Sequence, residues 1–116
     1  MEYIKINEAE YPATIYGKIK DSDWDGRSTK TITLSMSYAD AINLFIDGSK
    51  WSIISEEVIN ENGQDVITRQ EFNNDDYNLA GPITDMRDGT LLIKMGKLTE
   101  LEEAYQLLYG GVDSDE

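Results

Sequence analysis

The sequence predicts an α+β domain: a mainly antiparallel sheet of about seven strands, with two helices packed on one face. Apolar and polar residues alternate over 30–36, which is typical of a strand with one buried face. Two turn signals, Asn62-Gly63 and Arg87-Asp88-Gly89, join apolar stretches as hairpins. Two further segments combine helix-capping residues with helical spacing of apolar side chains. Hairpin-linked strands with separate helices are the pattern of the α+β class.

The N-terminal strands are expected over 2–7 and 11–20, joined by a hairpin loop at Glu8-Ala9-Glu10. The strand over 30–36 is expected to turn three apolar side chains toward the core, those of Ile32, Leu34 and Met36. Strands over 50–59 and 66–72 flank Asn62-Gly63. A last pair, over 77–86 and 90–97, flanks residues 87–89 and contributes Leu91, Ile93 and Met95 to the core.

The first helix is expected to begin after Ser37, whose hydroxyl can cap its first turn, and to end at Asp47-Gly48. Its buried stripe follows the i, i+3, i+4, i+7 spacing, with Tyr38, Ala41, Ile42 and Phe45.

The second helix begins at a capping box formed by Thr99 and Glu102, and Gly110 is placed to end it. Its apolar stripe consists of Leu101, Ala104, Tyr105 and Leu108. Residues 1–111 are therefore expected to form a single domain, and residues 112–116 a short acidic disordered tail.

The charge composition most strongly restricts the function. The 116 residues include 23 Asp and Glu against 10 Lys and Arg, no His and no Cys, and the net charge is −13. Without His or Cys we expect a non-enzymatic protein that holds no cofactor. The negative charge repels phosphates and anionic lipids, so we expect neither direct nucleic-acid binding nor membrane binding. The lack of Cys and of a secretion signal favours a cytoplasmic location.

The segment Asp21-Ser22-Asp23-Trp24-Asp25-Gly26 matches the first half of a calcium-binding loop, in which alternate carboxylates converge on the ion. The second half does not match, because Ile32 stands where a bidentate Glu is required. The alternative is a surface turn in which Asp side chains bond to the backbone. We therefore predict no metal site, with calcium binding as the minor alternative.

The two tryptophans have different expected environments. Trp51 lies in an apolar strand and is expected in the core. Trp24 lies among three aspartates in a predicted loop. It can be an exposed anchor for a basic partner, or it can fold back as a lid over a sheet edge, and the sequence leaves both open.

The acidic residues expected to bind a partner fall into three groups. The loop contributes Asp21, Asp23 and Asp25 with Trp24; the hairpin around Asn62-Gly63 contributes Glu56, Glu57, Glu61 and Asp65; the last helix contributes Glu100, Glu102 and Glu103. Acids in a first helical turn also interact favourably with the helix dipole, so a solvated helix face is the alternative for the last group.

The magnitude of the charge allows a decoy for DNA if the fold concentrates it. A compact chain of this length has a radius of gyration of roughly 13 Å and a diameter of about 35 Å. Duplex DNA of that length carries on the order of 20 phosphate charges. The net charge of −13 is therefore somewhat over half of that of a duplex segment.

Several stretches resemble small proteins encoded in prophages of Gram-positive gut bacteria. They are Tyr11-Pro12-Ala13, Asp23-Trp24-Asp25-Gly26-Arg27 leading into Thr31-Ile32-Thr33-Leu34, the stretch from Gly81 to Thr90, and Lys97-Leu98-Thr99-Glu100-Leu101-Glu102. The resemblance covers most of the chain and implies two roles.

The first role is that of a small acidic, non-catalytic inhibitor. Such a protein would occupy the basic surface of a host nucleic-acid-binding defence protein, such as a CRISPR nuclease. Inhibitors of this kind include the anti-CRISPR proteins, many of which are small, acidic and free of enzymatic activity. The second role is that of an accessory or assembly protein of a phage tail, located in the virion, whose strands add to a neighbour's sheet edge. Both roles leave the oligomeric state open.

Overall fold

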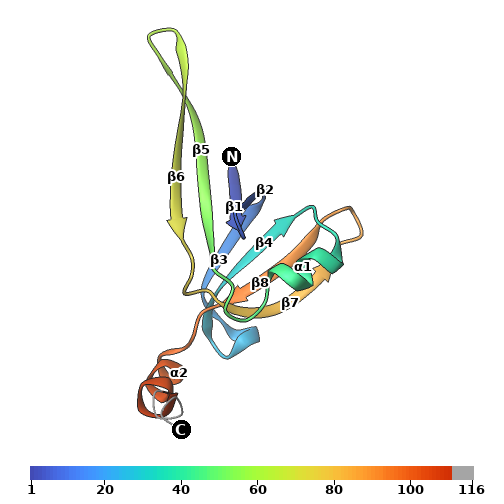
Figure 1. The fold of residues 1–116 in the computed structure, drawn as a ribbon, viewed down its shortest axis with the longest axis vertical. Helices are drawn as coiled ribbons and strands as arrows, with labels where there is room; N and C mark the ends of the chain where they lie inside the picture. The colour runs from blue at the N-terminus through green and yellow to red at the C-terminus, as the bar shows by residue number, and fades with distance from the viewer. Residues whose placement is uncertain (111–116) are drawn as a thin grey trace.

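The computed structural model describes residues 1–110, which form eight strands in two four-stranded antiparallel sheets together with two short α-helices (Figure 1). Sheet A has the order β2-β1-β5-β6 and consists of β1 (Glu2–Ile6), β2 (Ala9–Pro12), β5 (Trp51–Glu61) and β6 (Gln64–Asn73). Sheet B has the order β3-β4-β8-β7 and consists of β3 (Thr14–Asp21), β4 (Arg27–Leu34), β7 (Leu79–Asp85) and β8 (Leu91–Gly96). The predicted α+β class and antiparallel pairing are confirmed.

The eighth strand arises because the predicted strand over 11–20 is divided at Ala13. β2 pairs with β1 in sheet A, whereas β3 pairs with β4 in sheet B. The amide of Ala13 donates to the carbonyl of Glu2 at 3.1 Å, at the point where the chain passes between the sheets. The preceding turn is also shorter than predicted: Asn7 and Glu8 alone form it, both with positive φ.

One apolar core joins the two sheets and α1 (Tyr38–Leu44). It contains Ile4, Ile6, Trp51 and Ile53 from sheet A, Ile32, Leu34, Leu91, Ile93 and Met95 from sheet B, and Ala41 and Phe45 beside or within α1. The predicted core face of β8 and the burial of Trp51 are thus confirmed, and so is the core position of Ile32 and Leu34 on β4. Met36 lies beyond the end of β4 and is only partly buried. The indole of Trp51 donates to the carbonyl of Tyr77 at 2.9 Å, which satisfies its one polar group inside the core.

The two helices do not share one face of a sheet, which corrects the predicted arrangement. α1 is capped by Ser37 as predicted, buries Ala41, and ends at Phe45 rather than at Asp47-Gly48. On its outer side Tyr38 and Ile42 remain about half exposed, so only part of the predicted stripe is buried.

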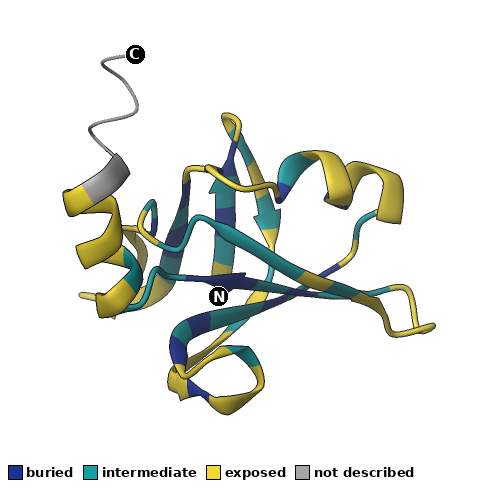
Figure 2. Ribbon diagram, turned by 90° about the horizontal axis from the view of Figure 1, so that it is seen from below, coloured by how far each residue is buried: buried dark blue, intermediate teal, exposed yellow. Residues whose placement is uncertain are grey.

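α2 (Glu100–Tyr105) has the predicted capping box between Thr99 and Glu102 but contributes no buried residue. It continues as a π-helical segment, η2 (Gln106–Gly110), so Gly110 does not end the α-helix. α2 projects from one end of the body, and Figure 2 shows it almost entirely in the colour of exposed residues. The predicted tail over 112–116, with residue 111, lies outside the described residues.

The molecule is elongated because β5 is much longer than its neighbour β1. β1 pairs with β5 only up to Ser55, and beyond that point β5 and β6 continue as a two-stranded ribbon. We call residues 56–70 the arm (Figure 1). The radius of gyration is 17.0 Å and the extents are 62 × 35 × 28 Å, so the expected compact shape is wrong.

Candidate interaction site

The three predicted acidic groups lie at two opposite ends of the long axis. The arm carries Glu56, Glu57, Glu61 and Asp65 at one end (Figure 1). The loop over 21–26 and α2, which carries the last group, both lie at the other end (Figure 1). The structure therefore joins two of the predicted groups and separates the third from them.

The negative charge is concentrated toward these ends. The body, residues 1–55 and 71–99, holds 13 acidic against 9 basic residues. The arm has four acidic residues and one basic, Arg69, and residues 100–110 have three acidic and none basic. The body is thus close to charge balance, and a surface that mimics DNA along the whole molecule is not favoured.

Asp21 is buried and cannot take part in an exposed acidic surface, which corrects its predicted role. One carboxylate oxygen accepts from the Asp23 amide at 3.0 Å and caps the short 3₁₀ helix η1 (Ser22–Trp24). The other oxygen accepts from the Thr29 hydroxyl at 3.0 Å and from the Lys94 ammonium at 2.7 Å. The hydrogen bond from Lys94 is the main reason that the pKa of Asp21 falls to about 2.

Asp21 would be the first ligand of the half calcium loop, but its carboxylate already binds the ammonium group of Lys94. Among residues 1–110, no group of three or more carboxylate, His or Cys side chains is placed to hold a metal ion. The alternative of a turn, in which Asp side chains bond to the backbone, describes the loop as it stands.

Trp24 folds back over the edge of sheet B, which is the lid arrangement of the two that the sequence left open. Its six-membered ring lies on Gly81 of β7 and Gly96 of β8. A Cβ added at either glycine would lie 2.7 Å from Trp24 Cζ3. The ring therefore needs a glycine at both positions. The exposed side of Trp24 lines an open cleft of about 410 Å³ with Asp23, Pro82 and Lys94.

Arg27 connects this loop to α2. Its side chain is buried, and its guanidinium carbon lies 4.9 Å from the centre of the Trp24 ring. Two guanidinium nitrogens donate to the Glu102 carboxylate at 2.7 and 3.0 Å. Glu102 also accepts from the Thr99 amide at 2.9 Å in the capping box. The hydrogen bond from Arg27 lowers the pKa of Glu102 to about 2. Glu102 is thus used within the fold.

Four predicted acids remain exposed at this end: Asp23, Asp25, Glu100 and Glu103. The side chain of Asp25 is 80% exposed, although it lies 3.5 Å from Arg27. This acidic end, defined by these four residues, is one of two surfaces open to a partner.

The arm is the second surface. Every residue from 57 to 73 is exposed, and the ladder from Ser52–Asn73 to Glu61–Gln64 continues without a register shift. Val58 lies opposite Ile67 on one face of the ribbon, and Ile59 lies opposite Val66 on the other. Val58 and Ile67 are each 63% exposed. The arm therefore presents an apolar pair on both faces.

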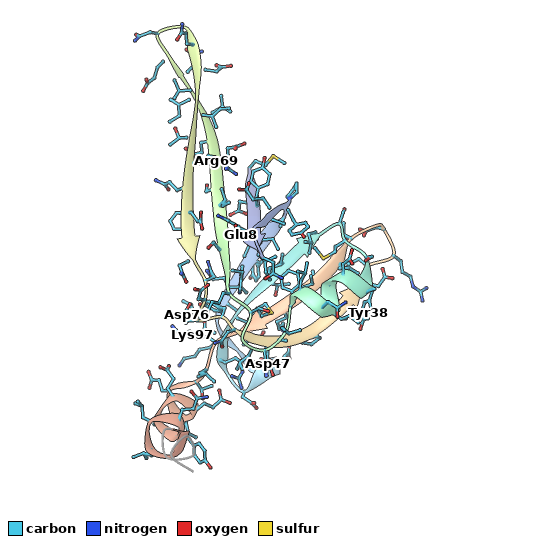
Figure 3. The ribbon with its side chains drawn as sticks, viewed as in Figure 1. Glu8, Tyr38, Asp47, Arg69, Asp76 and Lys97 are labelled. Carbon is cyan, nitrogen blue, oxygen red and sulfur yellow. The ribbon has the colours of Figure 1, made fainter. Side chains whose placement is uncertain are left out.

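Arg69, which is labelled in Figure 3, fixes the base of the arm to the neighbouring strands of sheet A. Its guanidinium lies 2.6 Å from Glu10 and 3.1 Å from Glu56, and 5.7 Å from the centre of the Tyr3 ring. The hydrogen bond from Arg69 lowers the pKa of Glu10. Since Glu56 is held by these contacts, Glu57, Glu61 and Asp65 form the exposed acidic part of the arm.

Two exposed apolar features were missed in the sequence. The first is the pair of apolar doublets Val58-Ile59 and Val66-Ile67. Adjacent residues of a strand point to opposite faces, so each doublet places one apolar side chain on each face, a usable signal. The second is the α2 stripe, where Leu101 is 81% and Leu108 is 67% exposed. The sequence predicts that this helix packs on one face of the sheet, because amphipathic helices usually bury their apolar face.

No protein family, curated protein or solved structure matches the chain. Within the described residues, no helix is long and apolar enough to cross a membrane. The assignment of function therefore rests on the surfaces described above.

The packing of Trp24 on Gly81 predicts that a methyl group added at position 81 lowers the stability of the fold. In Gly81→Ala the new Cβ would lie 2.7 Å from Trp24 and 2.8 Å from the Lys94 carbonyl. We expect a loss of about 1–3 kcal/mol in the free energy of unfolding, measured in urea, with a shift in tryptophan fluorescence as the ring moves.

The matched control is Gly17→Ala, where the nearest atom to the new Cβ is 3.9 Å away. Its stability should stay within about 0.5 kcal/mol of the wild type. Equal effects of the two variants would show that Trp24 does not rest on Gly81.

The buried Asp21–Lys94 pair predicts how stability depends on pH. The pKa of Asp21 is lowered in the folded protein, so the unfolded chain takes up a proton first on acidification. The stability that this group contributes is complete above about pH 4 and is lost as the pH falls toward 2. Asp21→Asn should be less stable than the wild type at pH 7 and should lose less stability on acidification.

Chemical denaturation at several pH values measures this dependence. Glu57→Gln removes one exposed carboxylate instead and should follow the wild-type profile. Parallel profiles for Asp21→Asn and the wild type would contradict a role for the pair.

Proposed function

We propose that this protein is a non-catalytic binding protein that acts through the arm, as an accessory or assembly protein of a phage tail. The prophage-type resemblance of the sequence supplies this class of role. The supporting observation is the exposed two-stranded ribbon with an apolar pair on each face.

The rest of the fold contributes little to the stability of the arm. An isolated two-stranded hairpin is only marginally stable in water, and exposed apolar side chains outside a core lower solubility. A partner that covers both faces would bury Val58 and Ile67 on one side and Ile59 and Val66 on the other. The partner surface is accordingly a cleft or a joint between two subunits rather than a flat surface.

The charge of the arm indicates the rim of that cleft. Glu57, Glu61 and Asp65 are exposed, while Arg69, the arm's one basic residue, contacts Glu10 and Glu56. Lys or Arg side chains around an apolar cleft would complement these carboxylates and favour docking in one orientation.

A second candidate is the inhibitor of a host nucleic-acid-binding protein, such as a CRISPR nuclease. The observation that favours it is the acidic end, where Asp23, Asp25, Glu100 and Glu103 are exposed. Arg27 links the loop to α2 through its contacts with Asp25 and Glu102. We place it second because the body is close to charge balance and a charge decoy makes no use of the apolar pairs.

The double variant Val58→Ser, Ile59→Ser tests the first proposal. It removes one apolar side chain from each face and leaves β6 unchanged. With the gene expressed in a lysogen whose phage is induced, the wild-type chain should be found in purified virions. The variant should be at least about tenfold depleted there, because both contact faces lose apolar area. Quantitative mass spectrometry measures the ratio.

Ile19→Ser is the control, because Ile19 is a strand residue that is 86% exposed but lies outside the arm. It should be incorporated like the wild type. Finding the wild-type chain only as free protein, never with particles, would overturn the tail role.

The second candidate predicts salt-dependent binding to a basic protein. Against a purified CRISPR nuclease without guide RNA, neutralising the acidic end should weaken binding at least about tenfold, and raised salt should weaken the wild type too. The neutralised residues are Asp23, Asp25, Glu100 and Glu103. The matched control neutralises four exposed acids elsewhere, namely Glu2, Glu8, Asp40 and Glu71. Equal losses in the two variants, or binding that guide RNA does not displace, would argue against this role.

A further inference from the structure

The four sheet edges differ in how well they are protected from pairing. β2 has four residues and ends at Pro12, which cannot donate to a ladder. β3 is irregular between Lys18 and Asp21 and exposes two lysines, and β7 is irregular around Pro82. Short strands, bulges, lysine and proline all hinder the addition of another strand. Among the edges in residues 1–110, β6 has none of these features over its ten residues.

The backbone groups of β6 that point to the free edge can be identified from a hydrogen bond that β5 makes on the side away from β6. The Glu56 amide donates to the Met1 carbonyl at 2.8 Å, so it points toward β1 and away from β6. The Glu56–Arg69 pair is therefore a non-hydrogen-bonded pair, and the backbone groups of Arg69 point outward. Alternation along the strand makes Ile67 and Asp65 outward-pointing as well.

A hydrogen bond at the far end of the ladder supports this assignment. The Asn74 amide donates to the Trp51 carbonyl at 2.9 Å, so Asn74 points toward β5. It lies five residues from Arg69, and an odd separation reverses the direction. The edge of β6 thus offers the groups of Asp65, Ile67 and Arg69 at regular spacing.

The side chains along this edge are self-complementary about Ile67. Reading outward from Ile67, Val66 corresponds to Thr68, Asp65 to Arg69, and Gln64 to Gln70. An antiparallel copy of the same strand, centred on the same residue, would place a β-branched residue opposite another, a carboxylate opposite a guanidinium, and an amide opposite an amide. No other protein is needed to supply a complementary strand.

We propose that two copies of this chain pair through β6, antiparallel, about a two-fold axis at Ile67. The two sheets A then form one continuous eight-stranded sheet. Outward-pointing groups meet outward-pointing groups: Ile67 faces Ile67 of the second copy, and Asp65 faces Arg69 of the second copy twice. The interface is isologous, as in most homodimers.

The alternative registers with the same backbone match are less favourable. Centring the pair on Thr68 places Asp65 opposite Glu71, which brings like charges together twice. Centring it on Val66 places Asp65 opposite Ile67 and leaves Arg69 opposite Gly63.

The charges near the seam are compatible with pairing. Arg69 already contacts Glu10 of β2 and Glu56 of β5, so its guanidinium points across sheet A and away from the free edge. These ion pairs are partly exposed, and in the dimer Arg69 exchanges them for Asp65 of the second copy. Glu57 and Glu61 lie on β5, with β6 between them and the seam. The repulsive carboxylates of the arm therefore lie one strand away.

The experiment is sedimentation equilibrium of the purified chain and of Ile67→Pro. Proline at position 67 removes an amide that points to the free edge, so the β5–β6 ladder keeps its hydrogen bonds. We expect a dimer for the wild type and a dissociation constant at least about 100-fold higher for Ile67→Pro, with an unchanged far-ultraviolet spectrum.

Two further variants complete the series. Asp65→Arg places like charges opposite each other twice and should weaken the dimer at least about tenfold without a proline in the strand. Val58→Thr changes the residue opposite Ile67 on β5 and leaves the edge intact, so its dissociation constant should stay within about threefold of the wild type. A wild-type chain that is monomeric at millimolar concentration overturns the proposal, whatever the variants do.

Spin labels test the register directly, because the chain has no native Cys. Positions 64 and 70 each lie three residues from the axis. Single-cysteine labels at Gln64 and at Gln70 should therefore give the same distance between copies, roughly 20 Å at about 3.4 Å per residue. Unequal distances would overturn the axis at Ile67.

This inference concerns the edge of β6, whereas the proposed function concerns the two faces of the arm. The two proposals can fail separately. A monomeric chain that still enters virions through Val58 and Ile59 would refute the dimer and leave the tail role standing. A dimeric chain that never joins a particle would refute the tail role and leave the dimer standing.

Discussion

The unequal lengths of β1 and β5 decide most of what distinguishes this molecule. β5 has eleven residues and β1 has five, so the ladder that closes sheet A on one side stops at Ser55. Glu56 still exchanges hydrogen bonds with Met1, and beyond Glu56 only β6 accompanies β5. The ribbon extends the molecule to 62 Å and leaves two apolar pairs without a core. The difference in strand length thus produces the candidate binding surface, whereas the free edge of β6 follows from its place as the last strand of sheet A.

The arm can keep its direction because charged groups fix its base. Arg69 reaches back from β6 to Glu10 of β2 and to Glu56 of β5, and stacks near Tyr3 of β1. These groups are partly exposed, so each ion pair is worth little in isolation. Together they join β1 and β2 to the ribbon at the point where backbone pairing with β1 ends. The apolar pairs near the tip are thereby presented at a defined angle from the body.

The opposite end is organised by a buried cation. Arg27 lies between the Trp24 ring and the Glu102 carboxylate, and Glu102 also caps α2. The position of α2 therefore depends on side-chain contacts rather than on an apolar face pressed against a sheet. The same arrangement decides which acidic residues remain exposed there, because Asp21 forms an ion pair with Lys94 and Glu102 forms one with Arg27. The fold thus places exposed acidic residues at both ends of the molecule, on a body in which acidic and basic residues are more nearly balanced.

The local features were within reach of the sequence. The turn at Asn62-Gly63, the caps at Ser37 and Thr99, and the alternating core faces of β4 and β8 depend on neighbours within a few residues. The candidate interaction surfaces depend on contacts between distant segments. Whether Asp21 is exposed depends on Lys94, 73 residues away, and the seat of Trp24 depends on glycines at 81 and 96. The chain's own alternation placed Val58 and Ile67 on one strand face, but only the tertiary structure, in which β5 and β6 extend beyond the core, leaves that face uncovered. The sequence by itself determines the side-chain chemistry and the hydrophobic period of each segment, because both depend on nearby residues. The tertiary pairing of strands decides which segments extend beyond the core, and therefore which surfaces stay exposed.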